Sequence, residues 1–332
     1  MSLTPGNIDR AIDIAKEELK NGCAGGEALR RTMMLKHQIQ VPRSFAREIV
    51  QILDGEGVRR RKRKRLRRRQ YINKGPNYVW HIDGYDKLTP FGFPIHGCID
   101  GFSRQIVWLK VGFTNKKPEV IAGHFVAAVE ELKGYPVRIR ADPGTENILV
   151  ARMQRALADK DSAFIYGTST SNQRIERFWG LLRQYKADFW IDHFKTLIAD
   201  GLYDRDNPLE RLCMQYSYMD YLQKELNSTK VLWNTHTIRK QHVGDVLSGV
   251  PQLMFGNPEL FETRDYINFC LDEEKDYLKT NTLSDSIDAD FKVVADDIVA
   301  KNNYKTPQMV DNIDSAKNLF VNLKAKFINQ LD

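Results

Sequence analysis

The chain has 332 residues, of which 42% are hydrophobic, and this is enough for one main domain with additional segments. Its formal net charge of +7 conceals an asymmetry, because residues 59–69 contain ten lysines and arginines among eleven positions. No run of eighteen apolar residues occurs and the first residues lack a hydrophobic signal core, so we expect neither secretion nor a membrane span.

The four cysteines, Cys23, Cys98, Cys213 and Cys270, are far apart in the sequence, and none belongs to a C-x-x-C pair. This spacing is unlike that of a disulfide framework or of a zinc site built on thiolates. We therefore expect reduced thiols in an intracellular protein.

Residues 1–57 are predicted to form a helical module. Three segments, 7–20, 25–38 and 42–57, have helical periodicity, and the third begins at Pro42 and ends in glycine. Short helices before a basic segment are typical of a helix-turn-helix module. A plain helical appendage is the alternative.

Residues 58–74 are predicted to be a basic linker. Its charges are too dense for the segment to fold on itself, so it lies in solvent or on a polyanion. Ten cations without an acid favour contact with double-stranded DNA and would also serve as an import signal, which predicts a location in the nucleus. The predicted DNA-binding residues of this run are Arg59, Arg60, Arg61, Lys62, Arg63, Lys64, Arg65, Arg67, Arg68 and Arg69.

From Tyr78 the hydrophobic period changes to two, which predicts strands. Segments 78–88, 93–104 and 105–115 are predicted to be three consecutive strands, the last two joined by a tight turn at 100–103. An amphipathic helix is predicted at 118–134, followed by a strand that Pro143 breaks.

A helix at 148–160, a short strand at 163–167 and a helix at 171–190 complete the alternating pattern. This order predicts an α/β fold of ribonuclease H-like type, with a mixed five-stranded sheet and helices on both faces. The core is expected to span residues 75–257, including helices after residue 207. Residues 258–332 are expected to form an acidic, partly disordered tail, because fifteen acids against nine basic residues leave a net charge of −6 from Glu259 to Asp332. Within this tail, residues 275–332 are expected to be partly helical or disordered.

Three carboxylates occur where such a fold brings segments together. Asp83 lies in the first strand, Asp142 ends the fourth, and Glu176 lies in the first turns of the helix at 171–190. Phosphoryl transfer uses such a set, because hard oxygen ligands hold two divalent ions roughly 3.5–4 Å apart and leave positions for water and phosphate. Asp83, Asp142 and Glu176 are therefore the predicted catalytic and metal-binding residues, with Mg²⁺ or Mn²⁺ as the cofactor.

The helix that carries Glu176 is predicted to present Asn172, Gln173 and Glu176 on one polar face that can meet DNA. Thr170 and Gln173 have the spacing of a capping box, which would fix the start of the helix. The opposite, apolar stripe consists of Ile175, Phe178, Trp179 and Leu182.

Any one of these acids, taken alone, is more often a local hydrogen-bonding group, and only their joint placement favours a site. Asp86 and Glu146 are rival acids a few residues away and are interpreted as supporting or surface groups. Asp100 is predicted to shape its turn through an Asx-type hydrogen bond.

The sequence resembles the retroviral-type integrase and transposase superfamily with an Asp, Asp, Glu triad, and it is most similar to integrase-core-domain proteins of animal genomes. The resemblance covers roughly residues 60–257 and depends on the segments "WHIDGYDKL", "GCIDGFSRQIVWLKV", "RADPGTEN", "STSNQRIERFWGLLR" and "WNTHTIR". It implies that Asp83, Asp142 and Glu176 are the triad, with 33 residues between the last two.

We interpret the chain as a nuclear, Mg²⁺-dependent polynucleotidyl transferase of integrase type, derived from a mobile element, that joins or nicks DNA. Arg174, Arg177 and Arg183 are predicted to hold DNA phosphates together with the basic run. A homo-oligomer is expected if the protein is active as an integrase. The alternative is a DNA-binding protein that keeps an integrase-like core as a catalytically unused scaffold.

Overall fold

The computed structural model describes residues 8–20, 25–58, 73–167, 172–239 and 247–331. The chain divides into two compact units, residues 1–70 and 71–332, and each is described by itself. The basic run at 59–69, with its predicted DNA-binding residues, lies outside the described residues. Among the helices that are described, none has both the length and the apolar character needed to cross a membrane.

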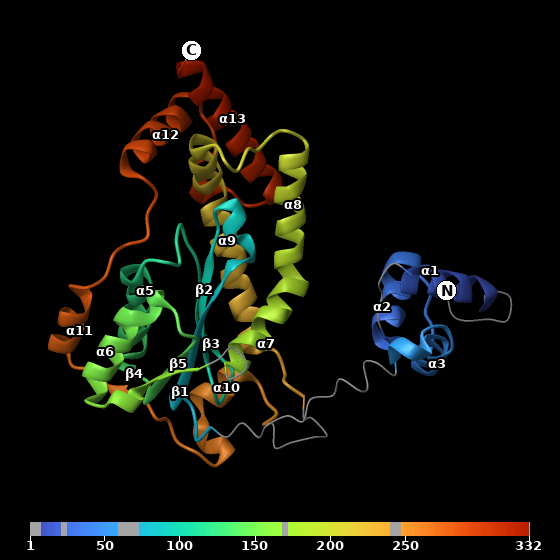
Figure 1. Cartoon of the computed structure of the whole chain (residues 1–332), viewed down its shortest axis with the longest axis horizontal. Coiled ribbons are helices and arrows are strands. Elements are labelled where there is room, and N and C mark those ends of the chain that lie inside the picture. Colours follow the sequence, from blue (N-terminus) through green and yellow to red (C-terminus); the bar gives the residue numbers. More distant parts are fainter. Residues whose placement is uncertain (1–7, 21–24, 59–72, 168–171, 240–246, 332) are drawn as a thin grey trace. The chain divides into compact units, whose positions relative to one another are not determined.

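The N-terminal unit contains the three predicted helices, α1 (Ile8–Lys20), α2 (Gly26–His37) and α3 (Arg43–Leu53), shown in blue in Figure 1. Glu27 forms ion pairs with Arg30 on its own helix and with Arg43 on α3, at 2.9 and 3.1 Å. The helix-turn-helix assignment stays a prediction. The small core of this unit consists of Ala11, Ala15, Leu29, Met33, Ile39, Val41, Ala46, Ile49 and Val50.

The second unit is built on the predicted mixed sheet of five strands, in the order β3-β2-β1-β5-β6. β1 pairs antiparallel with β2 and parallel with β5, which confirms the ribonuclease H-like topology. The strands are β1 (Val79–Tyr85), β2 (Ile95–Asp100), β3 (Ile106–Val111), β5 (Arg138–Ala141) and β6 (Phe164–Tyr166). Short strands β4 (Gly134–Tyr135) and β7 (Asn268–Phe269) pair separately.

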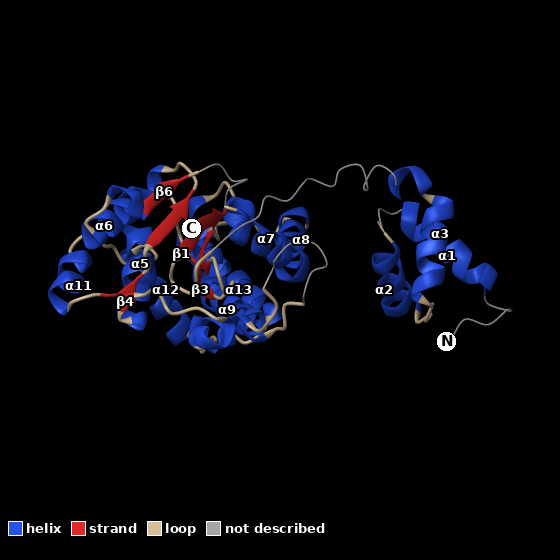
Figure 2. Ribbon diagram, turned by 90° about the horizontal axis from the view of Figure 1, so that it is seen from below, coloured by secondary structure: helices blue, strands red, loops and turns tan. Residues whose placement is uncertain are grey.

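Helices cover both faces of the sheet (Figure 2), and each face has its own hydrophobic core. On one face, α5 (Pro118–Leu132) and α6 (Ile148–Ala158) pack against Trp80 and Ile82. On the other face, α7 (Gln173–Leu182) continues through a π-helical turn, Arg183–Ala187, into α8 (Asp188–Ala199). The short 3₁₀ turns are Asp86–Phe91, Thr145–Asn147, Asp161–Ala163, Pro258–Phe261 and Pro307–Met309.

The predicted turn between β2 and β3 is confirmed, and Asp100 holds it together. Its carboxylate accepts hydrogen bonds from the backbone N–H groups of Phe102 and Ser103, at 3.1 and 2.7 Å, and from that of Asn77 at 2.8 Å. Burial raises the pKa of Asp100 to about 6, although these hydrogen bonds lower it. Asp100 is therefore a structural residue rather than a member of a catalytic set.

The long helix α9 (Pro208–Thr235) covers the outer edge of the sheet. The Asn234 side chain accepts a hydrogen bond from the Ile106 N–H at 2.8 Å and donates one to the Ile106 carbonyl at 3.1 Å. Gln223 bonds in the same way to Val111 and Leu109. These side-chain amides satisfy backbone groups of β3 that an exposed edge strand would leave open to pairing with another chain.

The C-terminal residues, for which the sequence left a partly helical or a disordered tail open, contain helices. After α10 (Pro251–Gly256), the structure has α11 (Asp272–Lys279), α12 (Ala289–Lys301) and α13 (Ile313–Leu331), and α13 lies beside α9 (Figure 1). Phe291 and Phe327 stack with ring centroids 5.1 Å apart, and Lys324 forms an ion pair with Glu210 at 2.8 Å. Of the two alternatives, the structure has the helical one for these segments, because their apolar residues recur at helical spacing despite the high charge.

Phe320 lies in α13 and is fully buried against α9, so Phe320→Ala is expected to destabilise the second unit by about 3–5 kcal/mol. Chemical denaturation of the full chain measures the effect. Phe269→Ala makes the same chemical change at a side chain that is 83% exposed, and we expect a change within about 0.5 kcal/mol. Equal effects of the two substitutions would contradict the packing of α13.

Candidate active site

Asp83 lies in β1, two residues before its carboxyl end, and Asp142 directly follows the last residue of the neighbouring parallel strand β5. His81 on β1 is opposite Arg140 on β5, and continuing this register by two residues places Asp142 beside Asp83. β5 ends at Ala141, because Pro143 offers no N–H for further pairing. The parallel pairing of β1 and β5 thus brings together, near the carboxyl ends of these two strands, two acids that are far apart in the sequence.

Glu176 approaches the same strand ends from α7. Trp179, one turn after Glu176, donates a hydrogen bond from its indole Nε1 to Asp83 Oδ2 at 2.8 Å. Residues three apart in a helix lie on the same face, so the Trp179 contact directs the Glu176 side of α7 toward β1. Glu176 itself is exposed, whereas Trp179 is buried.

The charges of the three carboxylates act on one another. Burial, acting against the opposing effect of the Trp179 hydrogen bond and together with the nearby Glu176 and Asp142 carboxylates, raises the pKa of Asp83 to about 7. Burial and the Asp142 carboxylate also raise the pKa of Glu176. Burial alone raises that of Asp142. The structure therefore brings the three predicted residues within range of each other's charge.

The donor set has the chemistry that a hard divalent cation requires. Three carboxylates supply oxygen ligands of the kind that Mg²⁺ and Mn²⁺ prefer. Asp142 Oδ1 is buried and has no hydrogen-bond partner among the described residues, so a cation would satisfy an oxygen that the protein leaves unpaired. The residues present therefore fit Mg²⁺ or Mn²⁺.

The three carboxylates nevertheless do not form a closed binding site for one ion. In the described part of the chain, no three His, Cys, Asp or Glu side chains are close enough to hold one metal ion in common. Like charges repel one another at short range, and carboxylates without a cation between them gain by standing apart. The Trp179 indole also holds one oxygen of Asp83.

The rival acids are engaged in local hydrogen bonds. Asp86 accepts from Thr89 Oγ1 at 3.2 Å and from Asn115 Nδ2 at 2.6 Å. Glu146 accepts from Asn147 Nδ2 at 2.7 Å, within the turn that follows β5. Both acids thus stabilise loops next to the three carboxylates.

The prediction that Asn172 faces DNA is wrong. Asn172 is 1% exposed; its Nδ2 donates to the Ile82 carbonyl at 3.0 Å, and its Oδ1 lies 2.7 Å from His81 Nδ1. α7 begins at Gln173 and its N-cap residue, Asn172, makes no side-chain cap bond, so Gln173 is not at the third position that a capping box requires. Thr170 lies outside the described residues.

His81 and Trp179 are site residues that the sequence interpretation did not assign. Because Asn172 Nδ2 donates to Ile82, its Oδ1 accepts the hydrogen bond that the His81 Nδ1–H donates. Burial lowers the pKa of His81 to about 3, so the ring is neutral at ordinary pH. Strand alternation places His81 on the same face as Asp83, and this was the available signal. Trp179 was assigned only to the apolar stripe.

The predicted phosphate-binding residues of this region have different environments. Arg174 is half-buried and its Nε donates to the Gly101 carbonyl at 3.1 Å, which ties α7 to the β2–β3 turn. Gln173 and Arg177 are exposed. Arg183 is exposed and forms an ion pair with Asp188 at 3.0 Å, a pairing weak enough to be exchanged for a phosphate.

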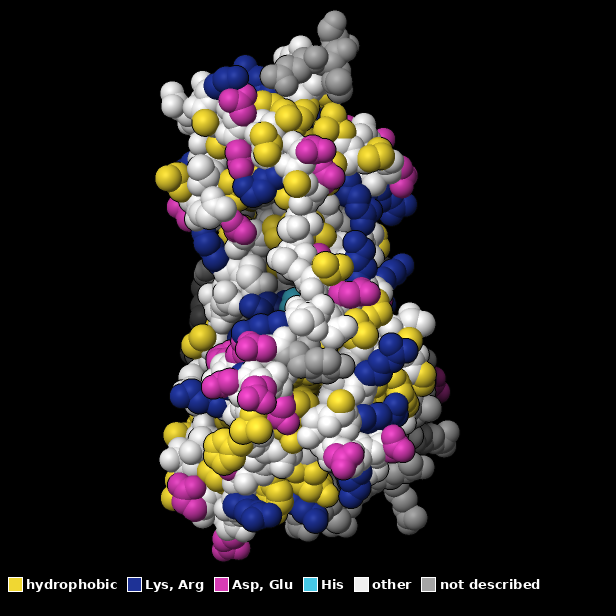
Figure 3. Space-filling view, turned by 90° about the vertical axis from the view of Figure 1, so that its left-hand side faces the viewer, with side chains coloured by type: hydrophobic (Ala, Val, Ile, Leu, Met, Phe, Trp, Pro, Cys, Tyr) yellow, Lys and Arg dark blue, Asp and Glu magenta, His cyan; other side chains and the backbone are white. Residues whose placement is uncertain are grey.

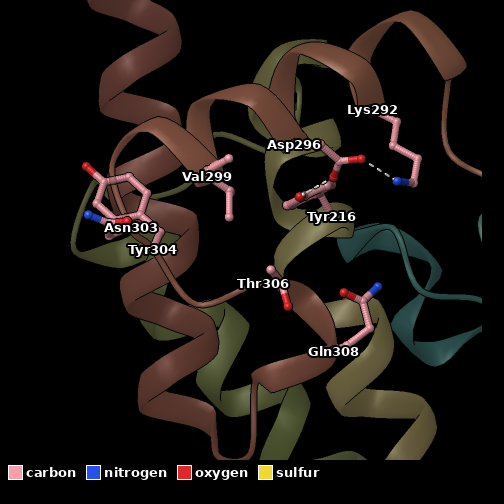
Figure 4. A pocket seen from close by; sticks show the side chains of 9 residues that line it. Tyr216, Lys292, Asp296, Val299, Asn303, Tyr304, Thr306 and Gln308 are labelled. Atoms are coloured by element: carbon pink, nitrogen blue, oxygen red, sulfur yellow. Dashed lines mark hydrogen bonds and ion pairs between the residues drawn. The ribbon is translucent and has the colours of Figure 1, made fainter.

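The surface and the hollows of the described residues add two observations. On the face shown in Figure 3, Lys and Arg side chains are interspersed with Asp and Glu rather than gathered in one patch. A hollow of about 490 Å³ lies between α9 and α12 (Figure 4), away from the three carboxylates. There Asp296 already accepts from Tyr216 at 2.6 Å and pairs with Lys292 at 2.5 Å.

The geometry agrees with a comparison against protein families. A family model described as Integrase core domain matches residues 70–247, which is more than half of the chain and includes Asp83, Asp142 and Glu176. A comparison with curated proteins finds no match.

Proposed function

Because the chain belongs to the integrase core domain family, we propose that it is a metal-dependent polynucleotidyl transferase that joins or nicks DNA. The observation that carries this proposal is the electrostatic coupling of Asp83 with Glu176 and Asp142, which come from a strand, a helix and the end of a second strand. Three interacting carboxylates at one edge of a sheet are the ligand set of phosphoryl transfer with divalent ions.

Asp83, Asp142 and Glu176 would hold Mg²⁺ or Mn²⁺, which supplies charge neutralisation at the phosphate and activation of the attacking oxygen. The residues around them keep their positions by hydrogen bonding. Trp179 orients Asp83, and the turn made by Glu146 and Asn147 follows Asp142. The substrate nucleophile would be a DNA 3′-hydroxyl or water, and the bond broken would be a phosphodiester.

Double-stranded DNA is the proposed partner, and Gln173, Arg177 and Arg183 would meet it beside Glu176. The basic run at 59–69 would supply most of the affinity, because ten cations can neutralise several phosphates. The same run would direct the protein to the nucleus. A homo-oligomer is proposed for the active form if the protein acts as an integrase.

A second candidate function is DNA binding by a protein whose integrase-like core is a catalytically unused scaffold. The observation in its favour is that, in the described residues, the three carboxylates do not close around a common metal position. An intact triad is necessary for catalysis and does not establish it.

A strand-joining assay separates the two candidates. Labelled duplex ends are incubated with the full chain and Mg²⁺, with Mn²⁺, or with a chelator. The transferase is expected to give joined or nicked products with either metal and none with the chelator. Duplex binding without products under all three conditions would replace the proposed transferase with the DNA-binding protein.

A further inference from the structure

Two side chains, one at the N-cap of α7 and one within the helix, make hydrogen bonds to β1 on either side of Glu176. Asn172 bonds to the Ile82 carbonyl at 3.0 Å and to His81 Nδ1 at 2.7 Å. Trp179 bonds to Asp83 Oδ2 at 2.8 Å. We call these bonds the α7–β1 contacts.

The spacing of these residues places the α7–β1 contacts and Glu176 on the same side of the helix. Glu176 follows Asn172 by four residues and Trp179 follows Glu176 by three, so the three lie along one stripe of the helix. The two outer residues bond to neighbouring positions of the strand that carries Asp83. His81, Ile82, Asn172 and Trp179 are buried and Asp83 is half-buried, so these bonds are largely shielded from water.

Gly97 makes room for the Trp179 contact. Gly97 on β2 is directly opposite Asp83 in the sheet. A Cβ atom at this position would lie 2.8 Å from the outer ring carbon Cη2 of Trp179, closer than real Cβ atoms approach. The indole also packs on Tyr85, with ring centroids 5.3 Å apart. A glycine here therefore allows the outer edge of the indole to approach β2 closely while its Nε1 bonds to the Asp83 carboxylate.

We propose that Asn172 and Trp179 are positioning residues that hold Glu176 at a fixed place relative to Asp83, with Gly97 providing the space that Trp179 needs. This inference rests on the proposed function in so far as Asp83 and Glu176 are taken as metal ligands. Glu176 and Asp83 come from separate elements, and hydrogen bonds between these elements limit how far the two carboxylates can move apart.

The physical reason is preorganisation. A side chain that hydrogen-bonds a ligating carboxylate fixes the orientation of its oxygens, and losing such a partner typically weakens metal binding about 10–100-fold. Trp179→Phe keeps an aromatic ring in the core but removes the indole N–H. Gly97→Ala keeps Trp179 and displaces its ring, so it tests the same contact from the other side.

Trp190→Phe is the matched control. Trp190 is buried in the same hydrophobic cluster, and its Nε1 has no hydrogen-bond partner among the described residues. The substitution therefore makes the same chemical change without removing a hydrogen bond to a carboxylate. The experiment titrates the full chain with Mn²⁺, measured by electron paramagnetic resonance, and measures amide hydrogen exchange of residues 173–182 in each variant.

We expect Trp179→Phe and Gly97→Ala to weaken Mn²⁺ binding about 10–100-fold and to accelerate exchange in residues 173–182, whereas Trp190→Phe does neither. Wild-type affinity and exchange in Trp179→Phe would overturn the positioning role. The proposed function predicts that the wild-type chain binds Mn²⁺ and that Asp83→Asn removes this binding. If the wild-type chain shows no such binding, the proposed function is contradicted. In that case faster exchange in Trp179→Phe, absent from Trp190→Phe, would still support the positioning of α7.

Discussion

Asp142→Asn is expected to abolish metal-dependent strand joining, with a loss of at least about 10³-fold, because each 1.36 kcal/mol of lost transition-state stabilisation is tenfold in rate and metal ligation supplies several kcal/mol. Folding and DNA binding should stay near wild type. The Asp142 carboxylate raises the pKa values of Asp83 and Glu176, so removing its charge relieves repulsion in the metal-free protein. Thermal stability should therefore hold or rise slightly.

Glu146→Gln is the control for this substitution. Glu146 is four residues from Asp142 and bonds to Asn147 within the following turn, so we expect strand joining near wild type. The measurement compares joining rates and melting temperatures of both variants. If Asp142→Asn melted several degrees below wild type without metal, Asp142 would be a structural hydrogen-bonding residue. This result would favour the DNA-binding protein whose integrase-like core is a catalytically unused scaffold.

Replacing the ten cations of residues 59–69 with glutamine is expected to remove most of the DNA affinity and to flatten its dependence on salt. A protein that makes six to ten phosphate contacts loses roughly 10³–10⁵ in affinity between 50 and 200 mM salt, because each contact releases condensed counterions. Duplex binding measured by fluorescence anisotropy at several salt concentrations gives the slope for each protein.

Lys301→Gln with Lys305→Gln is the control for charge as such. These exposed lysines pair with Asp297 and Asp311 near the C-terminus, at 2.7 and 3.5 Å, so their loss should leave the salt slope unchanged. An unchanged slope in the glutamine variant of the basic run would mean that the run serves import alone.

The proposed positioning role of Trp179 and the expected effect of Asp142→Asn concern two different kinds of residue in one site. Asp142 belongs to the set of carboxylates, and its loss removes a metal ligand. Trp179 acts through Asp83, so Trp179→Phe should weaken metal binding while saturating metal restores part of the joining activity. No excess of metal should restore activity to Asp142→Asn.

Local sequence determined the types of the elements in this protein. The period of two from Tyr78 follows from side chains that alternate across a sheet, and three strands, β1 to β3, lie where it predicts them. The turn at Asp100 was predictable because an aspartate bonds to backbone N–H groups two or three residues ahead. These features depend on neighbours in the chain, which the sequence states directly.

Net charge was a poor guide to the C-terminal residues. The acids there left a helical and a disordered alternative open, but several of them make specific bonds: Asp288 caps α12 by accepting from the Phe291 N–H at 2.9 Å, and Asp296 accepts from Tyr216. The apolar residues between the charges pack on α9. Burial of that face requires a partner surface that lies about a hundred residues away, so composition of the segment alone could not reveal it.

The three carboxylates are a prediction from the sequence, whereas their surroundings were decided by the tertiary structure. Asp83 and Asp142 become neighbours only because β1 pairs with β5 in parallel, and strand pairing is a long-range choice. Helical spacing placed Asn172 and Glu176 on one face but could not tell that Asn172 turns inward to β1 while Glu176 stays exposed. That difference arises because the strand offers a carbonyl and an imidazole at one end of α7, and a buried backbone carbonyl needs a hydrogen-bond donor.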